Sequence, residues 1–154
     1  MFTGGSGLTT LRMEHASIVD WVTDSIAVSE YPSSTTDLEQ FHAVINLDRF
    51  TPYHTNARHV HAPLIDGPGN TAEDVAALLK VTEERVHQGK VLVHCAAGVS
   101  RSPFIIALYL AWTESMPFED AIGLVASRRR RPLNIDPGLL QIKDQVLGLM
   151  VRRA

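Results

Sequence analysis

Short apolar runs rich in β-branched residues fill the first half of the chain, and turn-forming segments such as Tyr31-Pro32-Ser33-Ser34 separate them. Runs of this length and composition between turn signals predict β-strands. Between the second and the third of these strands, a short helix is expected. The expected strands cover residues 17–22, 25–28, 43–47 and 60–65, and the short helix covers residues 36–41.

From Asn70 onward, the apolar positions recur at a helical spacing. Asn70 is a candidate N-cap and Glu73 is an acidic residue in the first turn, a combination typical of a helix start. Gly89 is expected to end this helix in the left-handed conformation that favours glycine. The apolar face of the helix is formed by Val75, Leu78, Leu79 and Val86.

A short apolar strand at residues 91–93 is followed at once by a loop that contains Cys95. Pro103 suits the first turn of the next helix, which is expected to end near residue 114, because a first-turn residue needs no N–H donor. Two more helices are expected over about residues 117–130 and 137–150. This order of strands, βα units and helices predicts one α/β (α+β) domain, with a mixed sheet of about four or five strands flanked by helices.

Composition adds limits on the kind of protein. The 154 residues are 45% hydrophobic and 20% charged, which is ordinary for a globular domain, and the net charge of −3 argues against nucleic-acid binding. No uncharged apolar run is long enough to span a bilayer, and the start lacks the segments of a signal peptide. We therefore expect a cytoplasmic monomer without a membrane partner, with a flexible lead-in at residues 1–10 and a folded domain over residues 11–154.

The chain contains one cysteine, Cys95, which excludes an intramolecular disulfide and a Cys-rich zinc site. A lone cysteine is commonly buried and inert, so a core role is the alternative to a reactive thiol. The seven histidines are scattered. Pairs such as His59 and His61 fall at strand spacing without nearby carboxylates or thiols, so no metal site is predicted.

The residues that follow Cys95 favour a reactive thiol. A loop between a strand and a helix turns backbone N–H groups toward the positive end of the helix, where a phosphate dianion binds well. Gly98 lets the backbone curl close to such an anion. Arg101 follows, and its planar guanidinium can hold two phosphate oxygens. The same positive environment favours the nucleophilic thiolate form of Cys95.

The segment from His94 to Pro103 resembles a known signature. Cysteine followed by five residues and arginine is the loop of protein tyrosine phosphatases, and this version resembles their dual-specificity branch. The resemblance covers most of the chain, and it implies a protein tyrosine phosphatase-like fold and a phosphate-monoester hydrolase. Residues 21–28 look like the first strand pair of the branch, residues 43–47 like its next strand, and residues 131–141 like the segment that enters its last helix.

The resemblance also implies roles for the loop residues. Cys95 would be the nucleophile that forms a phosphocysteine intermediate, and Ser102 would donate a hydrogen bond to its sulfur. His94 would support the loop from behind and help keep the thiol ionised, rather than act as a proton shuttle. Arg101 would hold the phosphate and stabilise the transition state. The phosphate oxygens would bind the backbone amides of Ala96, Ala97, Gly98, Val99, Ser100 and Arg101.

A leaving alkoxide or phenoxide needs a proton, and the family supplies it from an aspartate about thirty residues before the cysteine. Asp66 lies 29 residues before Cys95, and the turn Gly67-Pro68-Gly69 follows it. Asp-Gly is also a common turn pair, which is the plain alternative. Glu73 and Asp74 are the nearest rivals for the acid, but we expect them to complement the dipole of the helix that starts there.

Four consecutive arginines, Arg128 to Arg131, form the other conspicuous cluster. One interpretation is a solvated helix end, where the terminal carbonyls favour cations. The other is a basic rim near the pocket that attracts acidic phosphorylated substrates. Of these two interpretations, we prefer the solvated helix end.

Other families with a similar loop fit less well. Low-molecular-weight tyrosine phosphatases and arsenate reductases place the loop close to the N-terminus, whereas here it begins near residue 95. The reductases also need additional cysteines. Rhodanese-type sulfurtransferases generally have a shorter loop.

The interior of the loop carries no charge, and this bears on the substrate. Phosphoinositide phosphatases of the superfamily tend to have Lys or Arg there, so a protein or peptide carrying phosphotyrosine, phosphoserine or phosphothreonine is the expected substrate. A phosphoinositide, an RNA 5′-phosphate or a small phosphoester is the alternative, and a pseudophosphatase that only binds phosphate is a second one. The loop amides and Arg101 would take the place of a metal, so no cofactor is expected.

Overall fold

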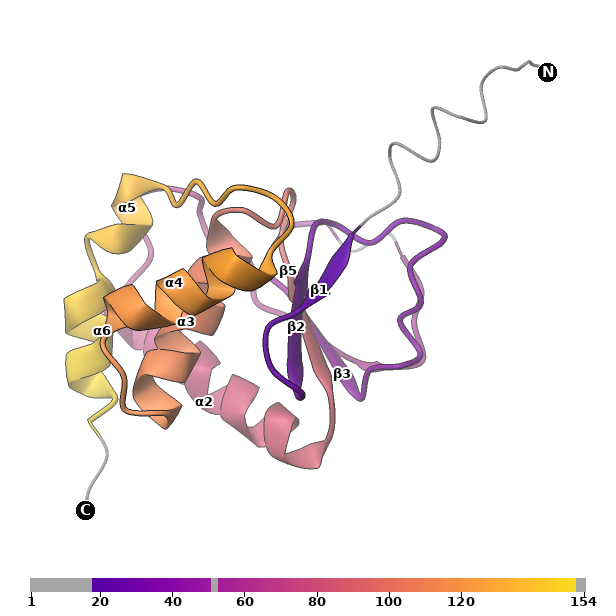
Figure 1. Cartoon of the computed structure of the whole chain (residues 1–154), viewed down its shortest axis with the longest axis horizontal. Helices are drawn as coiled ribbons and strands as arrows, with labels where there is room; N and C mark the ends of the chain where they lie inside the picture. Colours follow the sequence, from indigo (N-terminus) through magenta and orange to yellow (C-terminus); the bar gives the residue numbers. More distant parts are fainter. Residues whose placement is uncertain (1–17, 51–52, 152–154) are drawn as a thin grey trace.

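The computed structural model describes residues 18–50 and 53–151 and folds them into one sheet with helices packed on one of its faces (Figure 1). The strands are β1 (Val19–Trp21), β2 (Ile26–Ser29), β3 (Ala43–Asn46), β4 (Arg58–His61) and β5 (Val91–His94). Their spatial order is β1-β2-β5-β3-β4, with β1 antiparallel to β2 and the other neighbours parallel. The predicted mixed sheet is therefore confirmed. The lead-in expected at residues 1–10 lies outside the described residues.

Strand β5 lies at the centre of the sheet and is buried along its whole length. Its last residue, His94, is level with Ser29 at the end of β2 and with Asn46 at the end of β3. Parallel strands present their carboxyl ends at the same edge of a sheet, where ligands bind in folds of this kind. The loop after β5 therefore starts between the segments that follow β2 and β3.

The helices are α2 (Ala72–Gln88), α3 (Arg101–Thr113), α4 (Phe118–Arg128), α5 (Pro137–Leu140) and α6 (Lys143–Leu149). Helix α3 packs against α2, α4 and the sheet, and its residues from Ser102 to Ala111 are buried. An apolar composition on all sides of a helix is what such a central position requires. No helix in the described ranges combines the length and the apolarity needed to cross a membrane.

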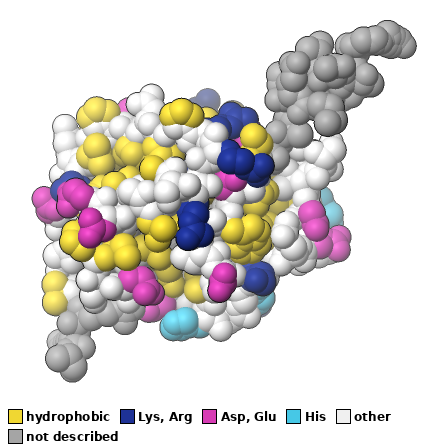
Figure 2. Space-filling view, viewed as in Figure 1, with side chains coloured by type: hydrophobic (Ala, Val, Ile, Leu, Met, Phe, Trp, Pro, Cys, Tyr) yellow, Lys and Arg dark blue, Asp and Glu magenta, His cyan; other side chains and the backbone are white. Residues whose placement is uncertain are grey.

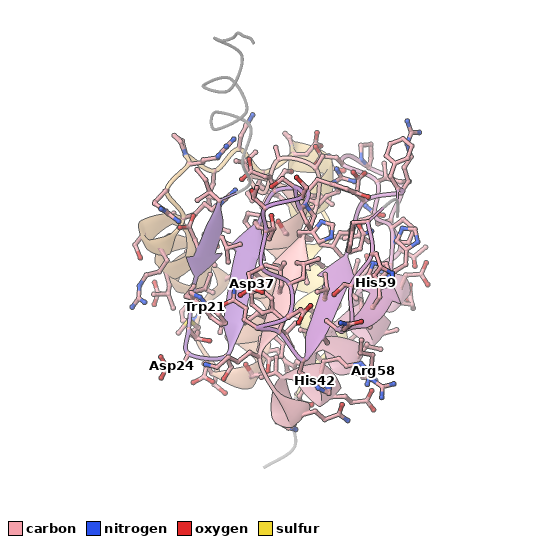
Figure 3. All side chains as sticks on the ribbon, turned by 90° about the vertical axis from the view of Figure 1, so that its right-hand side faces the viewer. Trp21, Asp24, Asp37, His42, Arg58 and His59 are labelled. Carbon is pink, nitrogen blue, oxygen red and sulfur yellow. The ribbon has the colours of Figure 1, made fainter. Side chains whose placement is uncertain are left out.

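Loops cover the other face of the sheet (Figure 3). Their apolar side chains form a second, smaller core with the strands, made of Ala27, Leu38, Phe41, Val44 and Leu92. The helix predicted over residues 36–41 is wrong, because this segment forms turns. Thr36 Oγ1 accepts a hydrogen bond from Ser33 N at 3.0 Å, and Asp37 Oδ1 accepts one from Glu39 N at 3.1 Å. Such local bonds compete with the hydrogen bonds of a helix.

The start of α2 differs from the prediction by one residue. Thr71, and not Asn70, is the N-cap, and its Oγ1 accepts a hydrogen bond from Asp74 N at 3.1 Å. Asn70 instead closes the preceding loop on itself. Its Oδ1 accepts from Ile65 N at 2.9 Å, and its Nδ2 donates to Ile65 O at 2.8 Å. Asn70 thus shapes the segment that contains Asp66.

The end of α2 was predicted at the correct residue but with the wrong conformation, and the end of one strand was predicted incorrectly. Gly89 ends α2 with a φ of 164°, which is extended and not left-handed. Glycine fits there for another reason, because a Cβ at this position would lie 2.6 Å from the Cβ of His42. Strand β4 ends at His61, so most of the strand expected over residues 60–65 is a loop.

The helix expected over residues 137–150 is two helices, α5 and α6. Ile142 N donates to Leu139 O at 3.2 Å, which tightens the end of the first helix, and Ile142 has a non-helical φ of −103° and ψ of 2°. Helix α4 ends at Arg128, two residues before the predicted end. Arg129 to Arg131 follow the helix, are not helical themselves and extend toward β1.

Candidate active site

The loop of residues 95–100 joins the central strand β5 to the buried helix α3. Gly98 has a φ of +71°, in the left-handed region that favours glycine. A Cβ at Gly98 would lie 2.7 Å from the carbonyl carbon of Ser29 and 2.8 Å from Glu30 N. Glycine is therefore required both for the turn of the loop and for its close packing on the end of β2.

The Cys95 thiol lies at the amino end of α3 and is buried. Ser102 contacts it twice, with its Oγ 3.2 Å from the sulfur and its backbone N donating to the sulfur at 3.5 Å. Helix α3 has no acidic residue in its first turn, and Ser100 makes no side-chain cap there. No carboxylate in the first turn of α3 offsets the positive end of the helix, which favours a bound anion there.

The His94 imidazole lies behind the loop and is fully buried. Burial lowers the pKa of His94 to about 4, so the ring is neutral near pH 7. Its Nδ1 lies 3.2 Å from Cys95 O, which can only accept, so Nδ1 carries the proton. Its Nε2 then accepts from the Tyr53 hydroxyl at 2.8 Å. His94 therefore lies behind the loop as a neutral ring that brings no positive charge to the thiol, and its support of the loop stays a prediction.

Tyr53 is a site residue that the sequence did not reveal. Its hydroxyl lies between His94 Nε2 and His59 Nε2, at 2.8 and 2.9 Å. Since the hydroxyl donates to His94, it accepts from His59, and burial raises the pKa of Tyr53. Tyr53 thereby fixes the tautomer of His94, although it is distant from the loop in sequence.

The Arg101 guanidinium lies beside the segments that follow β3 and β4. Its Nη1 donates to Leu47 O and Leu64 O at 3.3 Å each and to Asp48 Oδ1 at 3.4 Å. Its Nε is buried and has no hydrogen-bond partner among the residues that the structure describes. The side chain is thus held through Nη1, and its Nε donor is unpaired among the described residues.

Asp66 reaches the loop across the mouth of the site. Ser100 Oγ donates to Asp66 Oδ1 at 2.5 Å and accepts from Asp136 N at 3.0 Å. The structure therefore brings the predicted acid to the predicted phosphate-binding loop. Glu73 and Asp74, its rivals, lie in the first turn of α2, where acidic residues complement the helix dipole.

The segment that carries Asp66 packs tightly on the start of α5. A Cβ at Gly138 would lie 2.1 Å from Pro68 N and 2.4 Å from the carbonyl carbon of Gly67. Asp136 caps α5 by accepting from Gly138 N at 2.8 Å. The position of Asp66 thus depends on a helix that lies about seventy residues further along the chain.

Asp66 and Arg101 line the same cleft, which has a volume of about 430 Å³. Ile65 forms an apolar part of its rim and is 55% exposed. Within residues 18–50 and 53–151, no group of three or more potential metal ligands is found. The cleft itself offers an arginine and a carboxylic acid, and Cys95 lies buried in the loop that Asp66 contacts through Ser100.

Arg129 is the second site residue that the sequence did not reveal. Its side chain is fully buried and lies against the back of the loop. Its Nε donates to Gly98 O at 3.0 Å, and its Nη2 donates to Ala97 O at 3.3 Å. By binding these two carbonyls, Arg129 orients their peptide groups, so that the N–H of each group points away from Arg129.

Carboxylates near the start of the described chain balance the arginine cluster. Asp20 accepts from Arg129 Nη1 at 2.8 Å and from Arg130 Nε at 2.6 Å, and Arg131 pairs with Glu30 at 2.7 Å. Burial alone would raise the pKa of Asp20, but the hydrogen bonds from Arg130 and Arg129 more than offset it and lower that pKa.

The last three members thus have a role that neither interpretation named, and attraction of acidic substrates by the cluster stays a prediction. They brace the loop and β1 through ion pairs, with the Arg129 side chain buried and the Arg130 side chain 66% exposed. On the face in Figure 2, acidic and basic side chains are interspersed. The signal in the sequence was Asp20, an acidic residue within an apolar strand, because a buried carboxylate needs a partner.

Comparisons with known proteins agree with this geometry. The family model described as dual specificity phosphatase, catalytic domain, matches residues 26–142. Protein tyrosine phosphatase type IVA 3 of Mus musculus is 39% identical over 75 residues, which cover 47% of this chain and 43% of that protein. Dual specificity protein phosphatase OPG106 of vaccinia virus is 35% identical over 111 residues, which cover 64% of this chain and 62% of that protein. The chain thus spans less than two thirds of the length of both relatives.

Solved structures show the same fold. The crystal structure of human DUSP28 superimposes with a TM-score of 0.75 at 18% identity, over 85% of this chain and 93% of that chain. Tk-PTP in its active form superimposes with a TM-score of 0.73 at 22% identity, over 84% and 96%. The predicted protein tyrosine phosphatase-like fold is therefore confirmed. Since the family match covers most of the sequence, the chain belongs to the dual specificity phosphatase catalytic-domain family.

Proposed function

We propose that this chain hydrolyses phosphate monoesters of protein side chains through a phosphocysteine intermediate on Cys95. The observation that carries the proposal is a juxtaposition. The Cys95 sulfur faces the amino end of α3, and Asp66 is hydrogen-bonded to the same loop through Ser100. A nucleophile and a proton donor are thus held on one anion-binding loop.

In the first step, the Cys95 thiolate attacks phosphorus and the bond from phosphorus to the leaving oxygen breaks. The loop amides and Arg101 stabilise the charge that builds up on the phosphate oxygens, because they are already oriented before the reaction. Asp66 donates its proton to the leaving oxygen. The products of this step are the phosphocysteine and the free hydroxyl of the substrate.

In the second step, water attacks the phosphocysteine, and Asp66, now ionised, accepts a proton from that water. The phosphorus–sulfur bond breaks, and the electron pair returns to Cys95. Ser102 stabilises the departing thiolate, which its Oγ contacts at 3.2 Å. Inorganic phosphate is released, and Cys95 and Asp66 are restored to their starting forms.

The protein substrate class is supported by the loop itself. None of the side chains between Cys95 and Arg101 is charged, so the loop provides no cations for additional phosphates. Ala96 and Ala97 are exposed at its surface. A single phosphate on a protein side chain suits such a loop better than a multiply phosphorylated head group.

The experiment that tests this proposal compares two substrates with different leaving groups. Cys95→Ser should lower turnover of p-nitrophenyl phosphate by at least about 10³-fold, because no phosphocysteine can form. Asp66→Asn should slow hydrolysis of a phosphoserine peptide by about 10²-fold. It should affect p-nitrophenyl phosphate much less, because p-nitrophenol leaves readily without a proton.

Two results would contradict the proposal. Turnover that survives Cys95→Ser would exclude the phosphocysteine, and equal losses by Asp66→Asn on both substrates would exclude Asp66 as the acid. Faster turnover of a phosphoinositide than of any phosphopeptide would move the substrate class to lipids.

A further inference from the structure

A second cavity, of about 560 Å³, lies between two loops on the face of the sheet that the helices leave uncovered. The loops are residues 31–39, which follow β2, and residues 53–56, which precede β4. The volume is in the range of sites that bind small molecules or side chains. None of the catalytic roles proposed above uses this cavity.

Tyr31 connects this cavity to the catalytic loop. Its backbone N donates to Ala96 O at 2.9 Å, so the wall of the cavity is hydrogen-bonded to the residue after the nucleophile. Its ring packs edge-on against His94 and against Tyr53, with centroids 5.3 and 5.5 Å apart. Because an extended residue spans about 3.3 Å, residues close to the phosphorylated one in a bound peptide can reach the cavity.

The lining of the cavity favours a cation. Asp37 and Glu39 are both exposed on one loop, and Figure 3 shows Asp37 in front of the strands on this face. The rings of Tyr31 and Tyr53 line the same space. No Lys or Arg is among the lining residues that the structure describes, and His54 is the only basic side chain there.

Both parts of this lining attract the same group. Carboxylates attract an ammonium or a guanidinium through charge, and the faces of tyrosine rings attract it through cation–π interaction.

We infer that this cavity binds a lysine or arginine side chain that lies within a few residues of the phosphorylated residue in the substrate. The inference rests on the proposed protein phosphatase function and names the class of phosphopeptide that the site prefers. Substrates with several phosphates are disfavoured, because they would bring negative charge toward Asp37 and Glu39.

The test uses three phosphotyrosine peptides of equal length, in which the flanking residues are arginine, alanine or glutamate. The wild-type chain should hydrolyse the arginine peptide with a kcat/KM about tenfold above that of the alanine peptide, given two charge contacts of moderate strength. The glutamate peptide should be the poorest substrate. Raising the ionic strength should shrink the difference, because these charges are exposed.

The double variant Asp37→Asn, Glu39→Gln should bring the arginine and alanine peptides to within about twofold of each other. Asn at position 37 keeps the oxygen that accepts from Glu39 N, so the local turn is retained. The double variant should turn over p-nitrophenyl phosphate at the wild-type rate, because this substrate is too small to reach the cavity. The ratio of two peptides on one variant is independent of the fraction of active protein.

A second double variant, Glu84→Gln, Glu119→Gln, changes the net charge by the same amount at exposed positions on α2 and α4. It should keep the wild-type preference. Equal kcat/KM for the three peptides in the wild type would overturn the inference, and so would a preference that survives Asp37→Asn, Glu39→Gln. No turnover of any phosphopeptide would instead overturn the proposed function.

Discussion

The Ser100 hydroxyl contacts two acidic residues that come from different parts of the chain. It donates to Asp66 Oδ1 and accepts from Asp136 N. Because Ser100 does not cap α3 with its side chain, this hydroxyl is committed to the segment that carries Asp66. In the proposed mechanism, Ser100 is therefore a positioning residue, which acts on the leaving group through Asp66.

Ser100→Ala should reveal this role in the choice of leaving group. A hydrogen bond contributes about 0.5–1.5 kcal/mol, so loss of this contact should lower kcat on a phosphoserine peptide by up to about tenfold. Turnover of p-nitrophenyl phosphate should change by less than about twofold. Ser127→Ala, at an exposed serine that bonds only within its own helix, is the matched control. Equal losses on both substrates would assign Ser100 a merely structural role.

The residues of the site differ in whether the sequence alone could identify them. Cys95, Gly98, Arg101 and Ser102 lie within one short motif, so their spacing alone indicates phosphate chemistry. Asp66 followed from its distance to the motif. Tyr53 and Arg129 reach the loop only through the fold, from positions 42 and 34 residues away from Cys95. No local pattern marks such residues before the strand order is known.

At the scale of elements, the contact between α5 and the Asp66 segment is the most tightly packed part of the site. Gly138 leaves no room for a Cβ against Pro68 N and the Gly67 carbonyl carbon. Helix α5 therefore sets how close the Asp66 segment can come to the loop. An added methyl group should push that segment away from α5.

Gly138→Ala should lower the free energy of unfolding by about 2 kcal/mol through overpacking. It should also slow phosphoserine hydrolysis more than p-nitrophenyl phosphate hydrolysis, because Asp66 is displaced. Gly148→Ala is the control, since this helical glycine has open space around its Cβ position. There the same change should raise the free energy of unfolding by about 0.5–1 kcal/mol, measured by urea denaturation. Similar effects of both variants would argue against the packing explanation.

Helices and strands could be predicted where the apolar residues follow a regular spacing or form one short run. The helix α2 and the buried strand β5 are examples, and the apolar α3 follows from the proline in its first turn. The prediction failed over residues 36–41, because the apolar pair Leu38 and Phe41 has a helical spacing but packs from a loop. It failed again within residues 137–150, where a continuous apolar stripe hides the break at Ile142.

At the scale of the whole molecule, His94 makes stability depend on pH. Its pKa is about 4 in the folded chain because of burial, whereas an unfolded histidine titrates near 6.5. As the pH falls below about 6.5, the unfolded chain binds a proton that the folded chain excludes, so the folded state loses relative stability. This loss stops below about pH 4, where both states are protonated.

Between pH 7 and pH 5, the free energy of unfolding should therefore fall by about 2 kcal/mol through His94 alone. Urea denaturation at both values measures it. His94→Gln cannot titrate, so its decrease over the same interval should be smaller by that amount. An identical decrease in the two proteins would show that His94 is charged in the folded chain at pH 5.

The link from Arg129 to the first described residues affects where the chain can be shortened. Arg129 bonds Ile18 O at 2.8 Å and Asp20 Oδ2 at 2.8 Å while it holds the loop carbonyls. A fragment trimmed to the family match, residues 26–142, would lack this carboxylate and keep the buried guanidinium. Glu30 would still lie 3.6 Å from Arg129 Nη2, so the buried guanidinium would lose one of its two carboxylate partners, and the fragment should be less stable. A stable fragment should therefore begin at or before Ile18, upstream of the first residue of the family match.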